Sequence, residues 1–567
     1  KKGHDMSFPV HIKPAVQWAL IGTAIVTISA CQPYAASESE LASERNRIAA
    51  EQAKAQRVST LRYAQAQQLA EMSMQREQQL LVDRPASLPE HSLDVFNEYM
   101  ANPVHLTTEH PVSTFSSDVD TASYSYVRSV LNQGYLPQKH AVRLEEMVNY
   151  FDYDYPISND PNQPFTVASA IHPAPWAEDR HLIHIGVQGY LDQQAEQPDS
   201  NLVFLLDVSG SMSAEKKLPL VKKSIRLLLD NLKPTDSVAI VVYASASGVV
   251  LPPTQVADET AILAAINKLQ AGGSTAGGEG IQLAYKLAEQ NFKADAVNRV
   301  ILATDGDFNV GVTDPEQLET LIVNQRKKGI YLSVLGFGSG NYQEHLMQRI
   351  AQKGNGIAAY IDSLAEAQKV LVDEASANLY PIAKDLKIQV EFNSAVVQEY
   401  RLLGYETRAL AREDFNNDNV DAGDIGTGHS VTAIYEVTLV GSANPNVDAL
   451  RYQATTNAQT SDVASELAYI KMRYKLPGET ESQLISQAIT PADTLEKLSE
   501  TLADDIRFAT AVAGFAQLLT EAKHTGQWHL RDAQVLASNA RGHDPYGYRS
   551  EFVQLIRKAE LAQTHEF

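Results

Sequence analysis

The stretch 201-NLVFLLDVSGSMS-213 passes from an unbroken apolar run into a turn that carries one acid and three hydroxyls. A continuous apolar run of this length is typical of a strand buried on both faces of a parallel sheet. Asp207, Ser209 and Ser211 then alternate along the chain, so in an extended turn their side chains point the same way. The stretch predicts a buried strand with a cluster of oxygen atoms at its carboxyl end.

The same pattern recurs from Asn201 to about residue 375. The runs 299-RVILATD-305 and 330-IYLSVLGFG-338 read as further strands, and 218-LPLVKKSIRLLLDNL-232 reads as one of several amphipathic helices between strands. Alternating strands and helices, with strands that are almost wholly apolar, indicate a mostly parallel sheet covered by helices on both faces. We therefore expect a doubly wound α/β domain over residues 199–376.

Strand patterns without intervening helices flank this domain on both sides. They include 165-FTVASAIHPA-174 and 181-HLIHIGVQGY-190 before it, and 385-DLKIQVEFN-393 and 429-HSVTAIYEVTLVG-441 after it. Because the ends of an inserted domain lie close together, the flanking strands can pair with one another. We expect a β-sandwich, residues 164–198 plus 380–478, that is interrupted by the α/β domain. Residues 91–163 and 479–567 are expected to be helical regions.

The N-terminus carries the features of an export signal. An apolar stretch over residues 15–28 is short for a membrane span but suits the core of a signal peptide. The tetrapeptide 28-ISAC-31 resembles the lipobox of bacterial lipoproteins, which implies a signal peptide over 1–30 and lipidation of Cys31. A plain signal peptide that happens to end in cysteine is the alternative. Several acyl chains on Cys31 would anchor the protein firmly to a membrane.

The segment after the cysteine is rich in Ala, Glu, Gln and Arg and contains neither Gly nor Pro between residues 37 and 82. This composition favours helix, and its sparse apolar positions indicate a loosely helical tether over 31–90. Gln32, directly after the cysteine, resembles the outer-membrane sorting signal of Gram-negative lipoproteins. The expected location is the cell envelope, at the outer membrane facing the periplasm.

Composition excludes several kinds of site and partner. The net charge of −22 and a pI near 5.1 argue against a nucleic-acid partner, because phosphate binding needs clustered Lys and Arg. A single cysteine, Cys31, permits neither an intramolecular disulfide nor a cysteine-based zinc site. A cation or a basic partner suits the negative net charge better than a nucleic acid does.

Two further oxygen donors are expected beside the first strand. Thr275 lies in the glycine-rich loop 272-GGSTAGGEG-280, and Asp305 ends another apolar strand. Doubly wound sheets bind ligands beyond the carboxyl ends of their strands, where the strand order reverses. Carboxylates and hydroxyls without His or Cys favour Mg²⁺, Mn²⁺ or Ca²⁺ over zinc.

These residues resemble the metal-ion-dependent adhesion site of the von Willebrand factor A domain. The resemblance implies that five residues hold a divalent metal, most readily Mg²⁺: Asp207, Ser209, Ser211, Thr275 and Asp305. It also implies that the aspartates bind largely through water and that an open position accepts a Glu or Asp carboxylate from a protein partner.

Stretches outside this domain extend the resemblance. The sequences 113-STFSSDVDTASY-124, 142-VRLEEMVNYFDYDYP-156 and 414-DFNNDNVDAGDIGTGHSVTAIYE-436 are similar to the bacterial lipoprotein family typified by YfbK, in which flanking domains surround a von Willebrand A domain. This family resemblance implies architecture and location but little biochemistry. Together with the adhesion-site resemblance it leads us to expect an envelope protein that binds another protein and is not an enzyme. An envelope scaffold that works independently of metal is the alternative hypothesis, followed by a metal-dependent hydrolase.

Other chemistries fit the loops less well. The serines lack a G-x-S-x-G elbow and an evident His partner, and the loop around Thr275 lacks the Lys-Ser/Thr ending of a P-loop. The alternative of a degenerate domain without metal stays open. The acidic loop 414–424 fits the start of a calcium loop, but Asn419 and Ile425 replace its required Gly and Glu, so an acidic turn is favoured.

Four more features have a structural interpretation beside a functional one. Asp118 and Asp120 could bind a cation, but capping of the helix that begins at Asp120 or Thr121 is preferred. Glu279 reads as an acid at a helix N-terminus rather than a group behind the metal, and Asp307 as a turn residue. The aromatic run within 149–156 is expected in the core rather than in a binding patch.

Overall fold

The computed structural model describes residues 94–158, 160, 163–191, 198–273, 278–306, 315–338, 343–374, 381–447, 465–520 and 523–565. The chain divides into two compact units, residues 1–88 and 89–567, and the described residues all belong to the second. The expected signal peptide, the lipidation site Cys31 and the helical tether lie outside the described residues.

The central domain is built on a six-stranded sheet with the order β10-β9-β8-β5-β6-β7. Its strands are β5 (Ser200–Asp207), β6 (Ser237–Tyr243), β7 (Ser247–Gln255), β8 (Val297–Thr304), β9 (Ile330–Phe337) and β10 (Ala358–Ile361). Neighbouring strands are parallel except β7, which pairs antiparallel with β6 at the edge. The doubly wound α/β fold expected from the sequence is confirmed.

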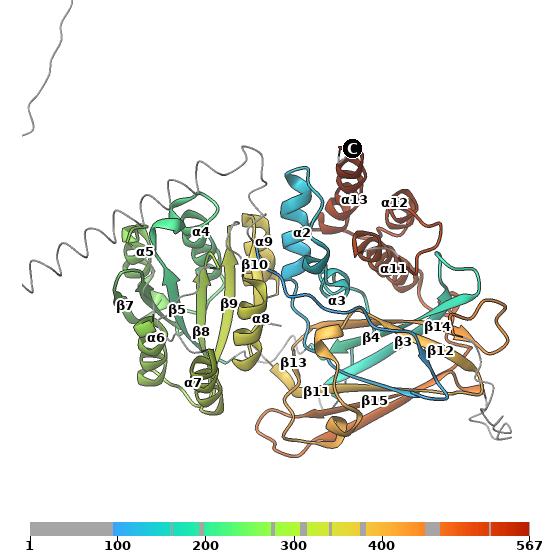
Figure 1. Cartoon of the computed structure of the whole chain (residues 1–567). Helices are drawn as coiled ribbons and strands as arrows, with labels where there is room; N and C mark the ends of the chain where they lie inside the picture. The colour runs from blue at the N-terminus through green and yellow to red at the C-terminus, as the bar shows by residue number, and fades with distance from the viewer. Residues whose placement is uncertain are drawn as a thin grey trace, which may run out of the picture. The chain divides into compact units, whose positions relative to one another are not determined.

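Helices cover both faces of this sheet (Figure 1). They are α4 (Leu218–Leu229), α5 (Glu259–Lys268), α6 (Gly278–Gln290), α7 (Pro315–Lys327), α8 (Glu344–Lys353) and α9 (Leu364–Gln368), with a π-helical turn at Lys369–Asp373 and 3-10 turns at Gly210–Ser213 and Val256–Asp258. Val203 and Leu205 of β5 enter the core under α6 to α8, whereas Phe204 enters the core under α4, α5 and α9. Burial on both faces explains why the strand is apolar throughout.

Two antiparallel sheets form the sandwich beside this domain. One has the order β1-β12-β14-β4-β3, and the other β13-β11-β15-β16 with β2 added on β11. The strands are β1 (His105–Leu106), β2 (Val112–Ser116), β3 (Phe165–Pro173), β4 (Arg180–Gly189), β11 (Pro381–Phe392), β12 (Val397–Leu403), β13 (Gly423–Gly426), β14 (Ser430–Leu439), β15 (Ala468–Lys475) and β16 (Gln483–Ile489). Strand β4 pairs with β14, so strands from before and after the central domain do share a sheet.

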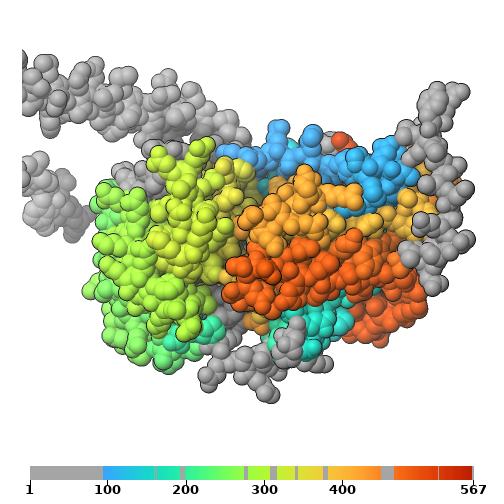
Figure 2. All heavy atoms as spheres, turned by 90° about the horizontal axis from the view of Figure 1, so that it is seen from below, coloured from blue at the N-terminus to red at the C-terminus, as the bar shows by residue number. Residues whose placement is uncertain are grey.

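The sandwich takes in more of the chain than the sequence predicted. Strands β1 and β2 come from residues 91–163, which we expected to be helical, and β16 lies beyond residue 478. Phe115 of β2 is fully buried in the sandwich core, and β2 pairs with β11 from Val112 to Ser116. Figure 2 shows the N-terminal residues of the described chain, in blue, along the orange segments that hold β11 and β12.

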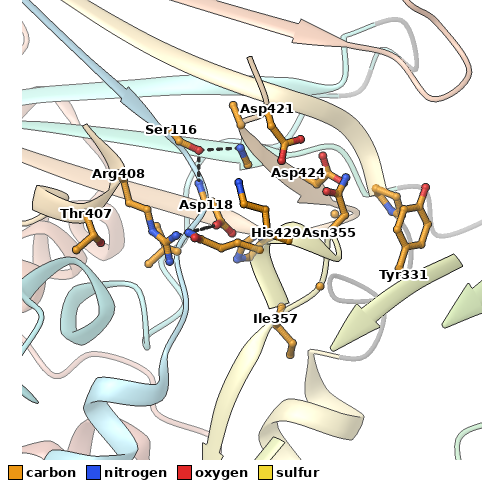
Figure 3. Close-up of a pocket in the computed structure, with 18 of the residues that line it drawn as sticks. Ser116, Asp118, Tyr331, Asn355, Ile357, Thr407, Arg408, Asp421, Asp424 and His429 are labelled. Carbon is orange, nitrogen blue, oxygen red and sulfur yellow. Dashed lines mark hydrogen bonds and ion pairs between the residues drawn. The ribbon is translucent and has the colours of Figure 1, made fainter. Parts of the chain in front are cut away.

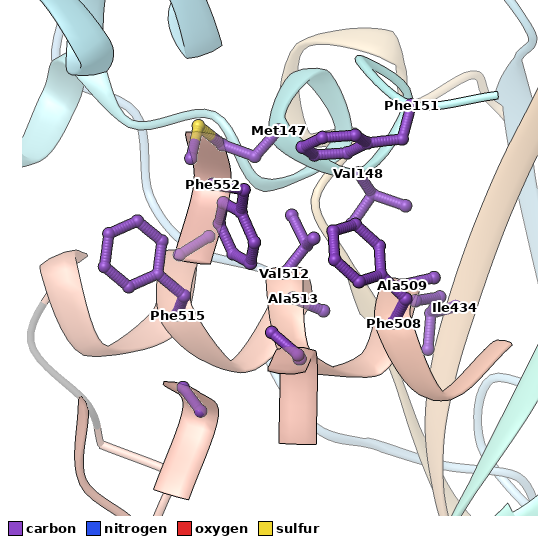
Figure 4. Packing of buried hydrophobic residues seen from close by; sticks show 14 of the residues in the cluster. Met147, Val148, Phe151, Ile434, Phe508, Ala509, Val512, Ala513, Phe515 and Phe552 are labelled. Carbon is purple, nitrogen blue, oxygen red and sulfur yellow. The ribbon is translucent and has the colours of Figure 1, made fainter. Parts of the chain in front are cut away.

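The remaining helices pack together above the first sheet of the sandwich. They are α2 (Ala122–Asn132), α3 (Leu144–Val148), α11 (Glu500–Thr520), α12 (Leu530–Asn539) and α13 (Tyr548–His565). Elsewhere in this part of the chain 3-10 turns occur at Lys139–Ala141, Glu406–Arg408, Arg412–Asn416 and Leu495–Lys497. Phe151, Phe508 and Phe552 meet edge to face in their core (Figure 4). Tyr150 and Phe151 are buried there, which confirms core packing for the aromatic run.

Buried arginines join the helices to the central domain. Arg128 of α2 contacts Asp362 at 2.5 Å, Glu366 at 2.8 Å and Glu551 of α13 at 3.2 Å. Arg143 pairs with Glu344 of α8 at 2.8 Å. Since each of these guanidinium groups is almost fully buried, the ion pairs hold the two parts of the molecule in one arrangement.

The two acids before α2 also contact residues of the central domain and of the sandwich. Asp120 accepts a hydrogen bond from the backbone N–H of Ala358, and Arg408 pairs with both Asp118, at 3.1 Å, and Asp120, at 2.8 Å. The helix begins after Thr121 without a side-chain cap. The expected capping by Asp120 is therefore wrong, because a buried arginine from the sandwich takes its carboxylate instead.

Candidate metal centre

The first three expected site residues lie together at the carboxyl end of β5. Asp207 is fully buried, and its Oδ1 accepts a hydrogen bond of 2.8 Å from the backbone N–H of Ser209. The hydroxyl oxygens of Ser209 and Ser211 are 3.0 Å apart. Ser211 is exposed whereas Ser209 is buried, so the cluster runs from the interior to solvent.

Asp305 lies at the end of the neighbouring strand. Strands β5 and β8 are parallel, with Leu206 opposite Ala303, so their carboxyl ends lie at the same edge of the sheet. Asp305 is 1% exposed, and its Oδ1 is buried without a hydrogen-bond partner among the described residues. A buried carboxylate oxygen without a donor is a fitting ligand for a cation.

The loop that leads to Thr275 is tied to the turn after β5. Gly272 donates to the carbonyl of Val208 at 2.8 Å, and Gly210 donates to the carbonyl of Gly273 at 3.0 Å. Gly273 has a φ of +88°, and a Cβ on it would lie 2.4 Å from Ser245 Oγ, so only glycine fits. Thr275 itself lies outside the described residues, two positions further on.

A lysine that the sequence analysis did not single out completes the described site. Lys217 Nζ lies 2.9 Å from Asp305 Oδ2, and the lysine side chain is 11% exposed. A Cβ on Gly338, which follows β9 and has a φ of +76°, would lie 2.4 Å from Lys217 Cε. Nothing in the local run 214-AEKK-217 marks this residue, because such a charged run ordinarily faces solvent.

Both site acids act on the pKa of Tyr243, which lies on the neighbouring strand β6. Burial raises the pKa of Tyr243 well above its usual range, with the negative charge of Asp207 as the next cause and that of Asp305 acting in the same direction. Tyr243 is opposite Asp207 in the register of β5 and β6. The phenol therefore stays protonated beside the acids.

The donor set fits a hard divalent cation. In the part of the chain that the structure describes, no three His, Cys, Asp or Glu side chains gather into a metal-binding group. The described set offers two carboxylates and two serine hydroxyls at one edge of the sheet. Oxygen donors of this kind suit Mg²⁺.

The nucleophile alternative finds no support among the described residues of the site. Among the described residues, no histidine is hydrogen-bonded to Ser209 or Ser211, as a nucleophile would require. Glu279 is exposed in the first turn of α6, as expected of an acid at a helix N-terminus. Asp307 lies outside the described residues.

The acidic loop 414–424 is a turn of the sandwich. Asp418 accepts hydrogen bonds from Ser482, and Asn416 accepts one from Arg473 at 3.2 Å. Lys387 donates to the carbonyl of Asp414. Because neighbouring strands occupy these oxygens, the interpretation as an acidic turn is favoured over a calcium loop.

Comparison with known proteins matches three family models along the chain. A model described as von Willebrand factor type A domain matches residues 201–374, a model described as von Willebrand factor matches 90–184, and the C-terminal model of Uncharacterized protein YfbK matches 377–561. Uncharacterized protein YfbK of Escherichia coli is 45% identical over 471 residues, which span 82% of this chain and 81% of that protein. The chain belongs to the YfbK family.

More distant similarity is confined to smaller shares of the YfbK-family chain. Uncharacterized protein sll0103 of Synechocystis is 30% identical over 185 residues, 33% of this chain and 43% of that protein. Human inter-alpha-trypsin inhibitor heavy chain H4 is 27% identical over 209 residues, 35% of this chain and 22% of that protein. The solved von Willebrand factor type A structure from Catenulispora acidiphila has a TM-score of 0.39 at 15% identity and covers 69% of this chain and 88% of its own. The type A domain indicates a role in protein–protein interaction for this YfbK-family protein.

Proposed function

We propose that this protein is a lipid-anchored envelope protein that binds a protein partner through a divalent metal, with Mg²⁺ as the preferred ion. Asp207, Ser209, Ser211 and Asp305 would hold the metal together with Thr275. A bound dication would offer an open coordination position to a Glu or Asp carboxylate of the partner. The proposal rests on the four described residues, which follow two adjacent parallel strands at the same edge of the sheet.

The charges around the site support a carboxylate as the partner's group. Asp207 and Asp305 carry two negative charges, and the Lys217 ammonium at 2.9 Å from Asp305 offsets one of them. The site therefore has a net charge of about −1 without metal and about +1 with a dication. An incoming carboxylate would bring the local charge to zero, which favours an anionic partner group over a neutral one.

The membrane anchor is proposed on the sequence alone. The lipobox-like ISAC and the following Gln32 support lipidation of Cys31 and an outer-membrane location facing the periplasm. Within the described residues, no helix combines the length and the apolar character needed to cross a bilayer. Radiolabelled palmitate incorporated into the parent chain and absent from Cys31→Ser would support the anchor, and label retained by Cys31→Ser would contradict it.

The decisive experiment measures partner capture as a function of metal. Crosslinking pull-downs from intact envelopes would compare the parent chain with Asp207→Ala and Ser209→Ala, with Mg²⁺ and with EDTA. We expect capture to need both Mg²⁺ and the intact turn. The mechanism is wrong if the same partner is captured by both variants and in EDTA.

A scaffold that binds its partner independently of metal is the second candidate. The ion pair between Lys217 and Asp305 favours it, because one site acid already has a cationic partner from this chain. In that case Mg²⁺ would raise the melting temperature without changing which partners are captured. Thermal melts and pull-downs on the same preparation separate the two functions.

A further inference from the structure

A cavity of about 220 Å³ lies where the type A domain meets the sandwich (Figure 3). Arg299 of β8 and Tyr331 of β9 line it from the amino ends of their strands, and Asp424 of β13 lines it from the sandwich. The candidate metal centre occupies the carboxyl ends of the same sheet. The cavity is therefore a separate site, and its ligand does not depend on the proposed metal.

Among the described residues, Arg299 is a buried cation that forms no ion pair. It is 4% exposed, its Nη1 donates to Ser333 Oγ at 2.7 Å, and its guanidinium carbon lies 5.6 Å from the centre of the Tyr331 ring. Its Nε is buried without an acceptor, and no carboxylate of the described residues lies within ion-pair distance. Burial lowers the pKa of Arg299 to about 10, and the charge of Asp424 across the cavity acts in the opposite direction without overcoming the effect of burial.

Asp424, on the sandwich side of the cavity, is an acid that forms no ion pair among the described residues. Its Oδ2 accepts from Asn355 Nδ2 at 3.1 Å and its Oδ1 from the backbone N–H of Asp385 at 3.3 Å, both neutral donors. Burial raises the pKa of Asp424 to about 7, against the lowering effect of Lys384. Asp424 and Arg299 face the same cavity but do not form an ion pair with each other.

The other charged groups of the wall are already balanced or lie at the rim. Asp118 pairs with Arg408 at 3.1 Å, and Asp421 pairs with Arg326 at 2.5 Å. Burial lowers the pKa of His429, so its ring is neutral near pH 7. Lys353 is exposed. Of the buried or partly buried charged groups that line the described wall, Arg299 and Asp424 are thus the two that form no ion pair, and they act on their charged neighbours only at longer range.

We propose that this cavity binds a small zwitterion of the amino-acid type, with its carboxylate at Arg299 and its ammonium at Asp424. A ligand with one charge of each sign compensates both groups and leaves the net charge of the cavity unchanged. The volume equals about seven water molecules, which is below the range for drug-sized ligands and suits a small molecule. The ring of Tyr331 offers an apolar surface to its side chain.

The test uses isothermal titration calorimetry on the full chain in detergent, with glycine and norleucine as zwitterions and with acetate and methylammonium as single-charge probes. We expect saturable binding of at least one zwitterion and binding about tenfold weaker or worse for each single-charge probe. Asp424→Asn, which keeps the shape of the side chain, and Arg299→Gln should each weaken zwitterion binding about tenfold or more.

Lys328→Gln, an exposed residue that pairs with Glu289, serves as the control and should leave the affinity unchanged. Asp207→Ala should also leave it unchanged, which separates this site from the proposed metal centre. If acetate binds as tightly as the zwitterions and Asp424→Asn has no effect, the cavity is an anion site and the proposal is wrong. Absence of saturable binding by every probe at millimolar concentration would overturn it as well, since the cavity then holds water.

Discussion

Lys217 Nζ lies 2.9 Å from Asp305 Oδ2, so a cation of the chain itself shares an acid with the proposed metal. The aliphatic part of the lysine runs against Gly338, where no larger residue would fit. This contact sets the charge of the site before any ligand arrives. Its removal should therefore change the binding of both the metal and the carboxylate.

Replacement of Lys217 by Gln should strengthen Mg²⁺ binding and weaken the capture of a carboxylate. Loss of a positive charge beside Asp305 removes a repulsion that, at this separation, corresponds to about tenfold or more in affinity. Titration calorimetry with Mg²⁺ measures the first effect, and retention on a column of immobilised glutamate peptide measures the second. Lys216→Gln, an exposed neighbour, is the matched control. An unchanged dissociation constant for Mg²⁺ in Lys217→Gln would contradict the role given to this lysine.

Gly338→Ala should disturb the same ion pair from the other side. A methyl group there would lie 2.4 Å from Lys217 Cε, and the φ of +76° is unfavourable for alanine by about 1 kcal/mol. We expect a modest loss of stability in urea melts together with a rise in Mg²⁺ affinity in the direction of Lys217→Gln. The same substitution at Gly441, with a φ of +92° and open space around it, should lower stability without altering Mg²⁺ binding.

Arg128→Met should destabilise the fold by about 3 to 5 kcal/mol, because it leaves Asp362 and Glu366 buried without their cation. Urea unfolding followed by tyrosine and tryptophan fluorescence measures the loss. Arg507→Gln breaks a partly exposed pair with Asp504 and should change the free energy of unfolding by less than about 1 kcal/mol. Equal effects of the two substitutions would show that the buried network does not hold the junction.

His184 should make the protein sensitive to acid. Its ring is buried, its Nε2 lies 2.6 Å from Tyr155 Oη, and burial followed by the charge of His172 lowers its pKa to about 3. The unfolded chain, with a pKa near 6.5, binds the proton first, so this stability is complete above pH 6.5 and is lost as the pH falls toward 3.

The difference between parent and His184→Gln isolates this effect from other titrating groups. Between pH 7 and pH 4.5 the parent should lose about 2 to 3 kcal/mol more than the variant. Urea melts of both chains at the two pH values provide the measurement. Parallel losses in the two proteins would mean that His184 does not titrate in this range.

Much of the central domain could be predicted from local sequence. Val203 to Leu206 are apolar in succession because alternate residues enter two cores, and this pattern is visible without a structure. The acid and hydroxyls after β5, and Asp305 after β8, follow from strand ends, which local patterns locate well. The sandwich strands beside the domain were recognisable for the same reason.

Other features depend on partners that are distant along the chain. Strand β2 is only five residues long and is held in the sandwich by its pairing with β11. The paired residues of the two strands are more than 270 positions apart in the sequence. Asp120 has the sequence of a helix cap, yet Arg408 and the backbone of Ala358 take its carboxylate. Neither outcome follows from the residues around it.

The sequence by itself thus determined the type A domain, the oxygen-bearing residues after two of its strands and part of the flanking strands, since each depends on a short periodic pattern. Tertiary structure alone decided that Lys217 meets Asp305 and that Arg299 and Asp424 face one cavity without pairing. The physical reason is that the free energy of a charged group depends on its burial and on its distance from an opposite charge. Both are set only when strands and loops that are distant in the sequence come together.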